Sequence, residues 1–266
     1  METAVVKQLL NQPADEAYHF SLSRPGDEAH DVQCVLFDEK SNAPLVWIIP
    51  DVLTSEQCDK WIEQAEKAGM SAASAATGSL RTSKRTNKFM SEELSQLVFS
   101  QLPPDFKEKL QESDGLSVDS IHANWRIVRY DAGDYFGPHY DQADIVTPLR
   151  PDGTKDFFFS SHTLLVNLSR ESSSIKGGAT RFYPRKNYSK AVDVSVPRGW
   201  AIAFSQKGML HAGHQVLEGT KHVAQAGLLR QLPPGGVFQP STFRVGPGLT
   251  EAVSLHAQSL QQQQEA

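Results

Sequence analysis

The chain reads RYDAGDYFGPHYD from Arg129 to Asp141, and this stretch decides the prediction of the fold. In an extended strand, side chains two residues apart point to the same side. His139 and Asp141 can therefore reach one point in space, where they offer a neutral imidazole and a carboxylate. Two ligands do not hold a catalytic metal, so a third ligand must come from elsewhere in the chain.

The best candidate for the third ligand is His211, in the segment GMLHAGH at residues 208–214. Two histidines and one carboxylate form the facial triad of non-haem Fe(II) oxygenases, which leaves the opposite face of the metal open. Lys221 follows His211 by ten positions, and a buried cation there suits a dicarboxylate co-substrate. His214 is the rival third ligand, but it lies only seven residues before Lys221. We expect structural roles for the histidines without such partners, His122, His162 and His222.

These motifs resemble those of the 2-oxoglutarate- and Fe(II)-dependent dioxygenases, and within them the prolyl 4-hydroxylase-like branch. That branch shows Arg-Tyr-x-x-Gly-x-x-Phe/Tyr-x-x-His-x-Asp, a distal His, and Gly-x-Lys with the Lys ten residues on. The parts stand here at residues 129–141, 211 and 219–221, in the same order and spacing. The resemblance covers roughly residues 45–232. It implies a mostly β fold with flanking helices and a double-stranded β-helix core, the cupin-like jelly roll.

The resemblance also implies roles for individual residues. His139, Asp141 and His211 would hold Fe(II). Lys221, with Tyr130 and a hydroxyl from Thr163, would bind the far carboxylate of 2-oxoglutarate. The triplet Arg81-Thr82-Ser83 resembles a substrate-proximal loop of prolyl hydroxylases, which makes Arg81 and Ser83 candidate substrate residues.

The implied reaction is hydroxylation of an aliphatic C–H bond, with O₂ and 2-oxoglutarate converted to succinate and CO₂. Ascorbate is a possible additional cofactor. Halogenases of this class leave the carboxylate position empty for chloride, and Asp141 fills it here.

The substrate stays open between a prolyl residue and a small molecule such as a free amino acid. Only Cys34 and Cys58 are present, so a disulfide framework is not indicated and a cytoplasmic protein is expected. This departs from the secretory-pathway collagen-type enzymes. A jelly-roll sensor that binds metal or 2-oxoglutarate without turnover is the alternative from another class; loss of a ligand or of Lys221 would favour it, and none is lost. A nucleic-acid demethylase is disfavoured by the acidic balance of charges.

Composition describes an ordinary globular chain of 266 residues with a net charge of −5. Such a charge gives no electrostatic footprint for nucleic acid or an anionic membrane, and no such partner is expected. A transmembrane run of apolar residues is missing, and residues 1–6 do not read as a signal peptide. One local basic cluster stands out: Arg81, Lys84, Arg85 and Lys88. It is either a solvated loop or a wall of the substrate mouth. The oligomeric state is not readable from the sequence.

Three parts of the chain are expected: an N-terminal arm or helix at 1–30, the dioxygenase domain at 31–236 and a partly mobile extension at 237–266. The domain is expected to have a helical N-terminal part before the jelly roll. Strands are predicted at 32–37, 45–49, 121–127, 162–168, 177–183, 190–196, 199–205 and 221–232. Helices are predicted after Thr54, whose pairing with Gln57 is a capping-box pattern, at 91–102 and at 105–111. Residues 70–90 and 142–160 are expected to be loops, the second a possible lid.

Overall fold

A computed structural model gives the fold of this chain. It describes residues 19–21, 31–38, 43–72, 81–86, 89–148, 151, 153, 156–170, 174–183, 191–231 and 244–245. The remaining residues lie outside this description. They include most of the predicted N-terminal arm and C-terminal extension, the Gln261–Gln264 run and Lys88 of the basic cluster.

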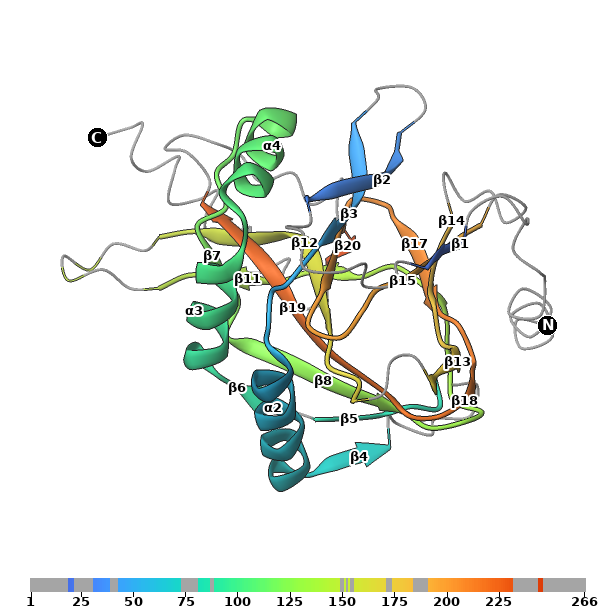
Figure 1. Cartoon of the computed structure of the whole chain (residues 1–266). Coiled ribbons are helices and arrows are strands. Elements are labelled where there is room, and N and C mark those ends of the chain that lie inside the picture. Colours follow the sequence, from blue (N-terminus) through green and yellow to red (C-terminus); the bar gives the residue numbers. More distant parts are fainter. Residues whose placement is uncertain are drawn as a thin grey trace, which may run out of the picture.

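Two β-sheets form the body of the molecule (Figure 1). The larger sheet follows the order β2-β3-β16-β12-β19-β8-β5-β4, and the smaller one β1-β15-β14-β17-β9. The central strands of the larger sheet are β12 (Phe158–Asn167), β19 (Lys221–Gln231) and β8 (Asn124–Tyr130). The flanking strands are β2 (Gln33–Phe37), β3 (Pro44–Ile49), β16 (Ala201–Ser205), β5 (Lys84–Thr86) and β4 (Met70–Ala72). The smaller sheet contains β1 (His19–Ser21), β15 (Val192–Ser195), β14 (Thr180–Tyr183), β17 (Leu210–Gly213) and β9 (Phe136–His139). The predicted mostly β jelly roll is confirmed.

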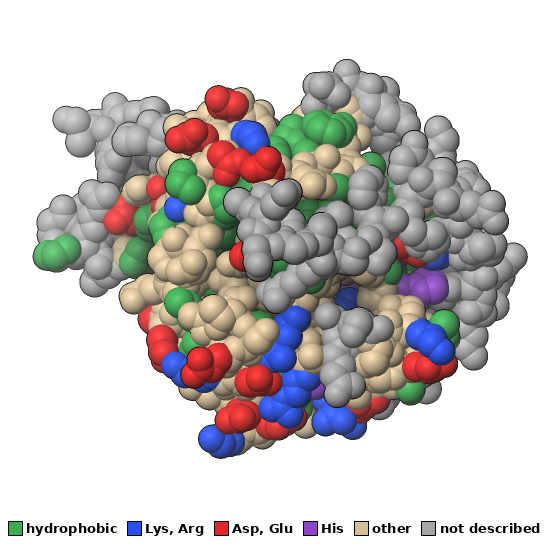
Figure 2. Space-filling view, viewed as in Figure 1, with side chains coloured by type: hydrophobic (Ala, Val, Ile, Leu, Met, Phe, Trp, Pro, Cys, Tyr) green, Lys and Arg blue, Asp and Glu red, His purple; other side chains and the backbone are tan. Residues whose placement is uncertain are grey.

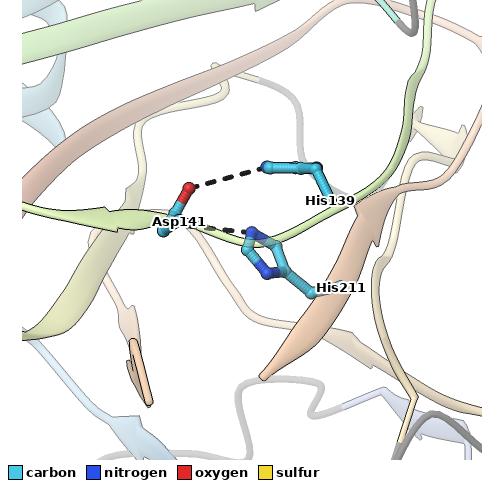
Figure 3. A group of neighbouring side chains, drawn as sticks. All are labelled: His139, Asp141 and His211. Carbon is cyan, nitrogen blue, oxygen red and sulfur yellow. Dashed lines mark ion pairs between the residues drawn. The ribbon is translucent and has the colours of Figure 1, made fainter. Parts of the chain in front are cut away.

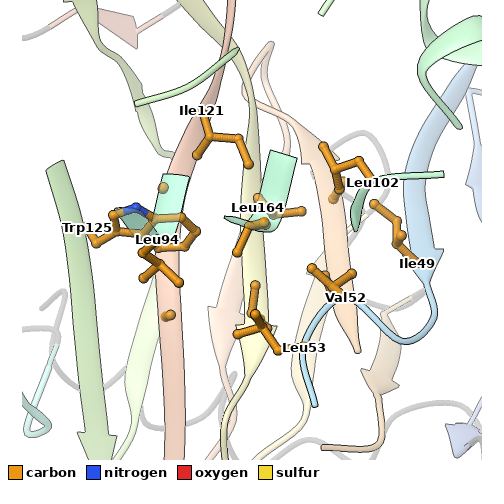
Figure 4. Close-up of a cluster of buried hydrophobic side chains, with 14 of the residues drawn as sticks. Ile49, Val52, Leu53, Leu94, Leu102, Ile121, Trp125 and Leu164 are labelled. Atoms are coloured by element: carbon orange, nitrogen blue, oxygen red, sulfur yellow. The ribbon is translucent and has the colours of Figure 1, made fainter. Parts of the chain in front are cut away.

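Three helices cover one face of the larger sheet: α2 (Ser55–Ala68), α3 (Glu92–Gln101) and α4 (Pro104–Asp114) (Figure 1). The core cluster on this face joins Leu94 of α3, Trp125 of β8 and Leu164 of β12, none of which is exposed (Figure 4). Burying each such side chain contributes about 1.5–3 kcal/mol. The helices therefore hold the larger sheet rigid from behind, and its other face is free to carry a site.

A second apolar cluster fills the space between the two sheets. Ile202 and Phe204 of β16 pack there against Phe182 of β14 and Val194 of β15. Their neighbours Ala201 and Ala203 in β16 belong to the cluster under the helices. This alternation of the two faces is the period of two that a β-strand imposes on its side chains. The second cluster thereby joins the two sheets.

Most predicted elements agree with the structure to within a few residues. Thr54 caps α2, with its hydroxyl accepting from the Gln57 amide and the Gln57 side chain accepting from the Thr54 amide. The apolar stripe of this helix, Cys58, Trp61, Ile62 and Ala65, is buried. The predicted helix at 91–102 is α3, with Ser91 as its cap, and the segment at 105–111 lies inside α4.

Two loop predictions are wrong in part. Residues 70–72 and 84–86 are β4 and β5, which pair with each other, and β5 also pairs with β8. The sequence Lys84-Arg85-Thr86 carries no apolar alternation, so the pairing with β8 makes it a strand. In the other segment, β11 (Ile145–Val146) pairs with the start of β12, so 142–160 contains two antiparallel strands. β10 (Gln142–Ala143) pairs with β20 (Arg244–Val245) from the C-terminal extension.

Within the described part of the chain, none of the helices combines the length and apolar character needed to cross a membrane.

Candidate metal and co-substrate site

The three predicted metal ligands meet at one end of the smaller sheet. β9 and β17 are antiparallel, and their register places His139 directly opposite His211. The sequence predicted that His139 and Asp141 lie in one strand. In the structure β9 ends at His139, and Asp141 lies just beyond it. Asp141 nevertheless turns to the same point: its Oδ1 lies 3.6 Å from Nε2 of His139, and its Oδ2 lies 3.7 Å from Nε2 of His211 (Figure 3). The three residues form the one group of possible metal ligands found among the described residues, and their ligand atoms lie within 4.8 Å of one another.

Backbone carbonyls fix the orientation of both imidazoles. Nδ1 of His139 lies 2.9 Å from the Gly137 oxygen, and Nδ1 of His211 lies 3.2 Å from the Met209 oxygen. An Nδ1–H that donates to a carbonyl leaves Nε2 unprotonated, with its lone pair directed to the centre of the group. Burial, followed by the neighbouring His139, lowers the pKa of His211 to about 4. His211 is therefore neutral at pH 7, the form that binds a metal.

Asp141 is held as a carboxylate. Burial raises its pKa, but His211, His139 and the Thr163 hydroxyl more than reverse that effect, and the pKa lies well below its usual range. Its Oδ2 accepts from Thr163 Oγ1 at 2.6 Å and from Gln225 Nε2 at 3.2 Å. Oδ1 has neither of these donors and faces His139. This division of hydrogen bonds favours a carboxylate that offers one oxygen to a metal.

A buried hydrogen-bond chain supports Thr163 from behind. Gln206 Nε2 donates to Thr163 Oγ1 at 3.1 Å, and Gln206 Oε1 accepts from Ser160 Oγ at 2.8 Å. Ser160 Oγ in turn accepts from the Asp144 amide at 2.7 Å. The Thr163 hydroxyl, predicted to reach 2-oxoglutarate, is therefore committed to Asp141. Register brings Gln206 and Gln225 into this chain, and no local motif pointed to either.

Lys221 is a half-buried cation on the same inner surface. It begins β19, and its register partner in β8 is Tyr130. Its Nζ donates to the Gly178 oxygen at 2.5 Å and lies 6.0 Å from the centre of the Tyr130 ring. No carboxylate of the described residues lies within ion-pair distance of it. Burial lowers its pKa to about 8. An ammonium that is largely withdrawn from water is costly without an anion, so this position favours an anionic ligand.

Tyr130 and Lys221 line one pocket with the two histidines. Other lining residues are Val128, Phe136, Leu165, Thr180, Gly213, Val223 and Gln225. Tyr130 is buried, which raises the pKa of its phenol. A side chain at Gly213 would lie 3.3 Å from the Tyr130 hydroxyl and 3.4 Å from Phe136, so glycine keeps this pocket open. The site thus combines three neutral or anionic donors with a cation at its other end.

Arg81 lies at the edge of the site. Its guanidinium sits 3.5 Å from the centre of the Phe136 ring, which stacks on His139 at 3.5 Å and an interplanar angle of 19°. The predicted substrate residue therefore approaches the metal ligands through one aromatic layer. Ser83 is fully buried, and its side chain lies beside Tyr130, behind the open face of the pocket. Phe136 was part of the sequence motif but had no predicted role.

His214 does not join the ligand group. Its backbone amide donates to the Ala179 oxygen in the turn after β17. His122 lies 3.4 Å from Asp144, and the buried His162 lies 2.9 Å from Ser161 Oγ. These contacts agree with structural roles for both residues.

Comparison with known protein families identifies one family that part of this chain matches. Residues 125–228 match the family described as the 2OG-Fe(II) oxygenase superfamily. No curated protein matches the chain.

Solved structures with a similar course of the chain include several hydroxylases. The collagen prolyl hydroxylase of Paramecium bursaria Chlorella virus-1 in complex with 2OG is 24% identical, with a TM-score of 0.48; the match covers 72% of this chain and 98% of that one. A prolyl-4-hydroxylase of Pseudomonas putida is 12% identical, with a TM-score of 0.47 and coverage of 71% and 93%. A Trichoplax adhaerens prolyl hydroxylase in complex with a peptide of hypoxia inducible factor is 14% identical, with a TM-score of 0.46 and coverage of 70% and 82%.

Proposed function

We propose that this chain hydroxylates an aliphatic carbon of a prolyl residue or of a small molecule such as an amino acid. Its residues 125–228 match the 2OG-Fe(II) oxygenase superfamily, and the chain is a 2-oxoglutarate-dependent Fe(II) dioxygenase. The single observation that carries the assignment of the site is a His-Asp-His group whose two histidines line one pocket with Lys221, a half-buried cation that pairs with no carboxylate of the described residues.

His139, Asp141 and His211 are the proposed ligands of Fe(II). Both imidazoles present Nε2, and the carboxylate is ionised, so all three are ready to bind a divalent metal without losing a proton. Three protein ligands leave the remaining positions of the metal for co-substrate and O₂.

Lys221 and Tyr130 are the proposed partners of the far carboxylate of 2-oxoglutarate. The ammonium is a compact point charge, and the phenol can donate a hydrogen bond to the same anion. Binding of the anion would give Lys221 a charged partner beside its hydrogen bond to the Gly178 carbonyl. The pairing would raise the pKa of Lys221, because a nearby negative charge favours the protonated amine.

When bound, iron and 2-oxoglutarate supply the oxidising power, with O₂ consumed and succinate and CO₂ released. The chain supplies orientation. Thr163 and Gln225 hold the carboxylate of Asp141 in place through hydrogen bonds to its Oδ2, and Phe136 packs against His139. The apolar wall formed by Val128, Leu165 and Val223 limits access of water to the reacting atoms.

The prolyl reading is supported by the motif at 129–141 and by the position of Arg81 over Phe136. Its test is turnover of a substrate panel with Fe(II), 2-oxoglutarate, O₂ and ascorbate. The panel contains capped prolyl peptides and free amino acids, and the readouts are succinate and a product heavier by one oxygen atom. A product from a prolyl peptide supports that reading, whereas a product from free amino acids alone supports the small-molecule reading. Binding of 2-oxoglutarate without succinate from any member would favour a sensor.

We also propose that residues 31–236 form one domain in a cytoplasmic protein. The larger sheet takes strands from β2 through β19, which supports a single unit, and Cys34 and Cys58 are free thiols. Limited proteolysis tests the boundaries: cleavage confined to residues 1–30 and 237–266 is expected, whereas an early cut within β8–β19 would contradict them. Cell fractionation tests the location.

A further inference from the structure

One face of β8 carries an arginine toward the candidate site. Trp125 and Ile127 belong to the core under the helices, whereas Val128 and Tyr130 line the pocket. Side chains alternate along a strand, so Arg126 shares the face of Val128 and Tyr130. Its register partner in β19 is Gln225, whose side chain donates to Asp141. Arg126 therefore lies beside Gln225, which donates a hydrogen bond to the proposed metal ligand Asp141.

A second arginine comes from β5 on the other side of β8. Arg85 lies directly opposite Val128, and residues opposite each other in an antiparallel pair project to the same side. Arg85 and Arg126 are therefore diagonal neighbours on the inner face. Arg81, over Phe136, is close enough to both for their charges to lower its pKa, after the larger effect of burial. Three guanidinium groups converge at this edge of the pocket.

The outer face of the same strands has a different charge balance. Lys84 and Arg129 are register partners there, and both pair with Asp131, at 3.1 and 2.9 Å. Figure 2 shows such mixing of blue and red side chains over the lower part of the molecule, where β5 and the end of β8 lie. Arg85 and Arg126 are half-buried, and no described carboxylate pairs with either. Arg85 and Arg126 therefore lack the paired carboxylate that Lys84 and Arg129 have in Asp131.

We propose that Arg85 and Arg126 bind a carboxylate of the substrate, so the substrate carries a carboxylate near the carbon that is hydroxylated. This inference rests on the proposed function. Arg suits the role because its planar guanidinium can hold a carboxylate through two parallel hydrogen bonds. The carboxylate can belong to a free acid or to an acidic residue of a peptide, since both offer the same group.

This anion position is distinct from that of 2-oxoglutarate. Lys221 is opposite Tyr130, and Gln225 is opposite Arg126, four residues along the strand. Four residues of a strand span about 13 Å. One end of the inner surface is therefore assigned to the co-substrate and the other to the substrate, with the metal ligands beside them.

A probe that needs no known substrate tests the carboxylate site. The full chain is loaded with Mn(II) and saturated with 2-oxoglutarate, and ¹⁹F relaxation of trifluoroacetate is measured, with trifluoroacetamide as the neutral control. We expect enhanced relaxation for the acid only. The double variant Arg85→Gln/Arg126→Gln should weaken trifluoroacetate binding by about tenfold or more, because charge-assisted hydrogen bonds are lost. The matched variant Lys84→Gln/Arg129→Gln removes two charges from the outer face and should change it less than about twofold.

Equal loss in both double variants, or equal enhancement for the amide, would overturn the proposal. So would a lack of enhancement in wild-type protein that still forms the Fe(II)–2-oxoglutarate chelate. A missing chelate band would instead overturn the proposed function. The source of the carboxylate is then decided by turnover of L-proline against L-prolinamide, and of a capped prolyl peptide with an adjacent Asp against one with Asn. Whichever acid is converted should show a KM raised about tenfold or more in the inner double variant. Conversion of the neutral members with an equal KM would contradict the proposal.

Discussion

His139 lies directly opposite His211 across the β9–β17 pair, with ring centroids 4.2 Å apart. Each ring is held by a carbonyl two residues before it in the chain, from Gly137 and Met209. The same local device thus orients both imidazoles, and the pairing of the strands brings them together. Asp141 needs only a turn after β9 to complete the group.

Removing the carboxylate should abolish metal-dependent activity. In Asp141→Ala, two neutral imidazoles remain, and the site loses its only anionic ligand. We expect the Fe(II) dissociation constant to rise by more than about 100-fold, a larger loss than residues that only support a ligand cause. Isothermal titration with Fe(II) under anaerobic conditions measures it. His214→Ala is the matched control and should bind Fe(II) like wild type; loss of binding there and not in Asp141→Ala would reverse the assignment.

Thr163 has two possible roles that one variant separates. Thr163→Val keeps the shape but removes the hydroxyl that donates to Asp141 Oδ2. If the residue positions Asp141, Fe(II) affinity should fall by roughly 10- to 100-fold while the KM for 2-oxoglutarate at saturating Fe(II) stays unchanged. A raised KM with unchanged Fe(II) affinity would support contact with 2-oxoglutarate instead. Ser169→Ala, another buried hydroxyl, controls for general loss of packing.

The resemblance placed the motif at 129–141 and the distal His211 because each is local in sequence and has a fixed order. The hydrogen-bond chain through Gln206 and Gln225 could not be placed, since it depends on which strands pair and in what register. The same reason explains β5: Lys84-Arg85-Thr86 has no strand-like pattern, and only its partner β8 makes it a strand. The hydrogen bond from the Thr163 hydroxyl to Asp141 could not be placed for the same reason.

Acid should destabilise the metal-free protein through its buried histidines. Burial, followed by the charge of Arg230, lowers the pKa of His162 to about 3, against about 6.5 in an unfolded chain. The unfolded state then binds a proton that the folded state does not, so stability is complete above about pH 6.5 and falls as the pH drops toward 3. Between pH 7 and pH 5 this one group should remove about 2 kcal/mol of unfolding free energy.

Urea denaturation at both pH values, in wild type and in His162→Gln, measures this contribution. The variant should show the smaller difference between the two pH values. An equal pH dependence in both proteins would mean that His162 does not titrate in this way.

The central claim is that one pocket holds Fe(II) through His139, Asp141 and His211 and anchors 2-oxoglutarate on Lys221. The most direct test is anaerobic absorption spectroscopy of the metal-free protein titrated with Fe(II) and 2-oxoglutarate. Wild type should develop the weak visible charge-transfer band of the chelate, and His211→Ala should not. Lys221→Met should need at least about tenfold more 2-oxoglutarate, because a charge-assisted contact is lost, whereas Lys176→Met, on an exposed pair with Glu218, should behave as wild type. A folded wild-type protein that shows no band would contradict the claim.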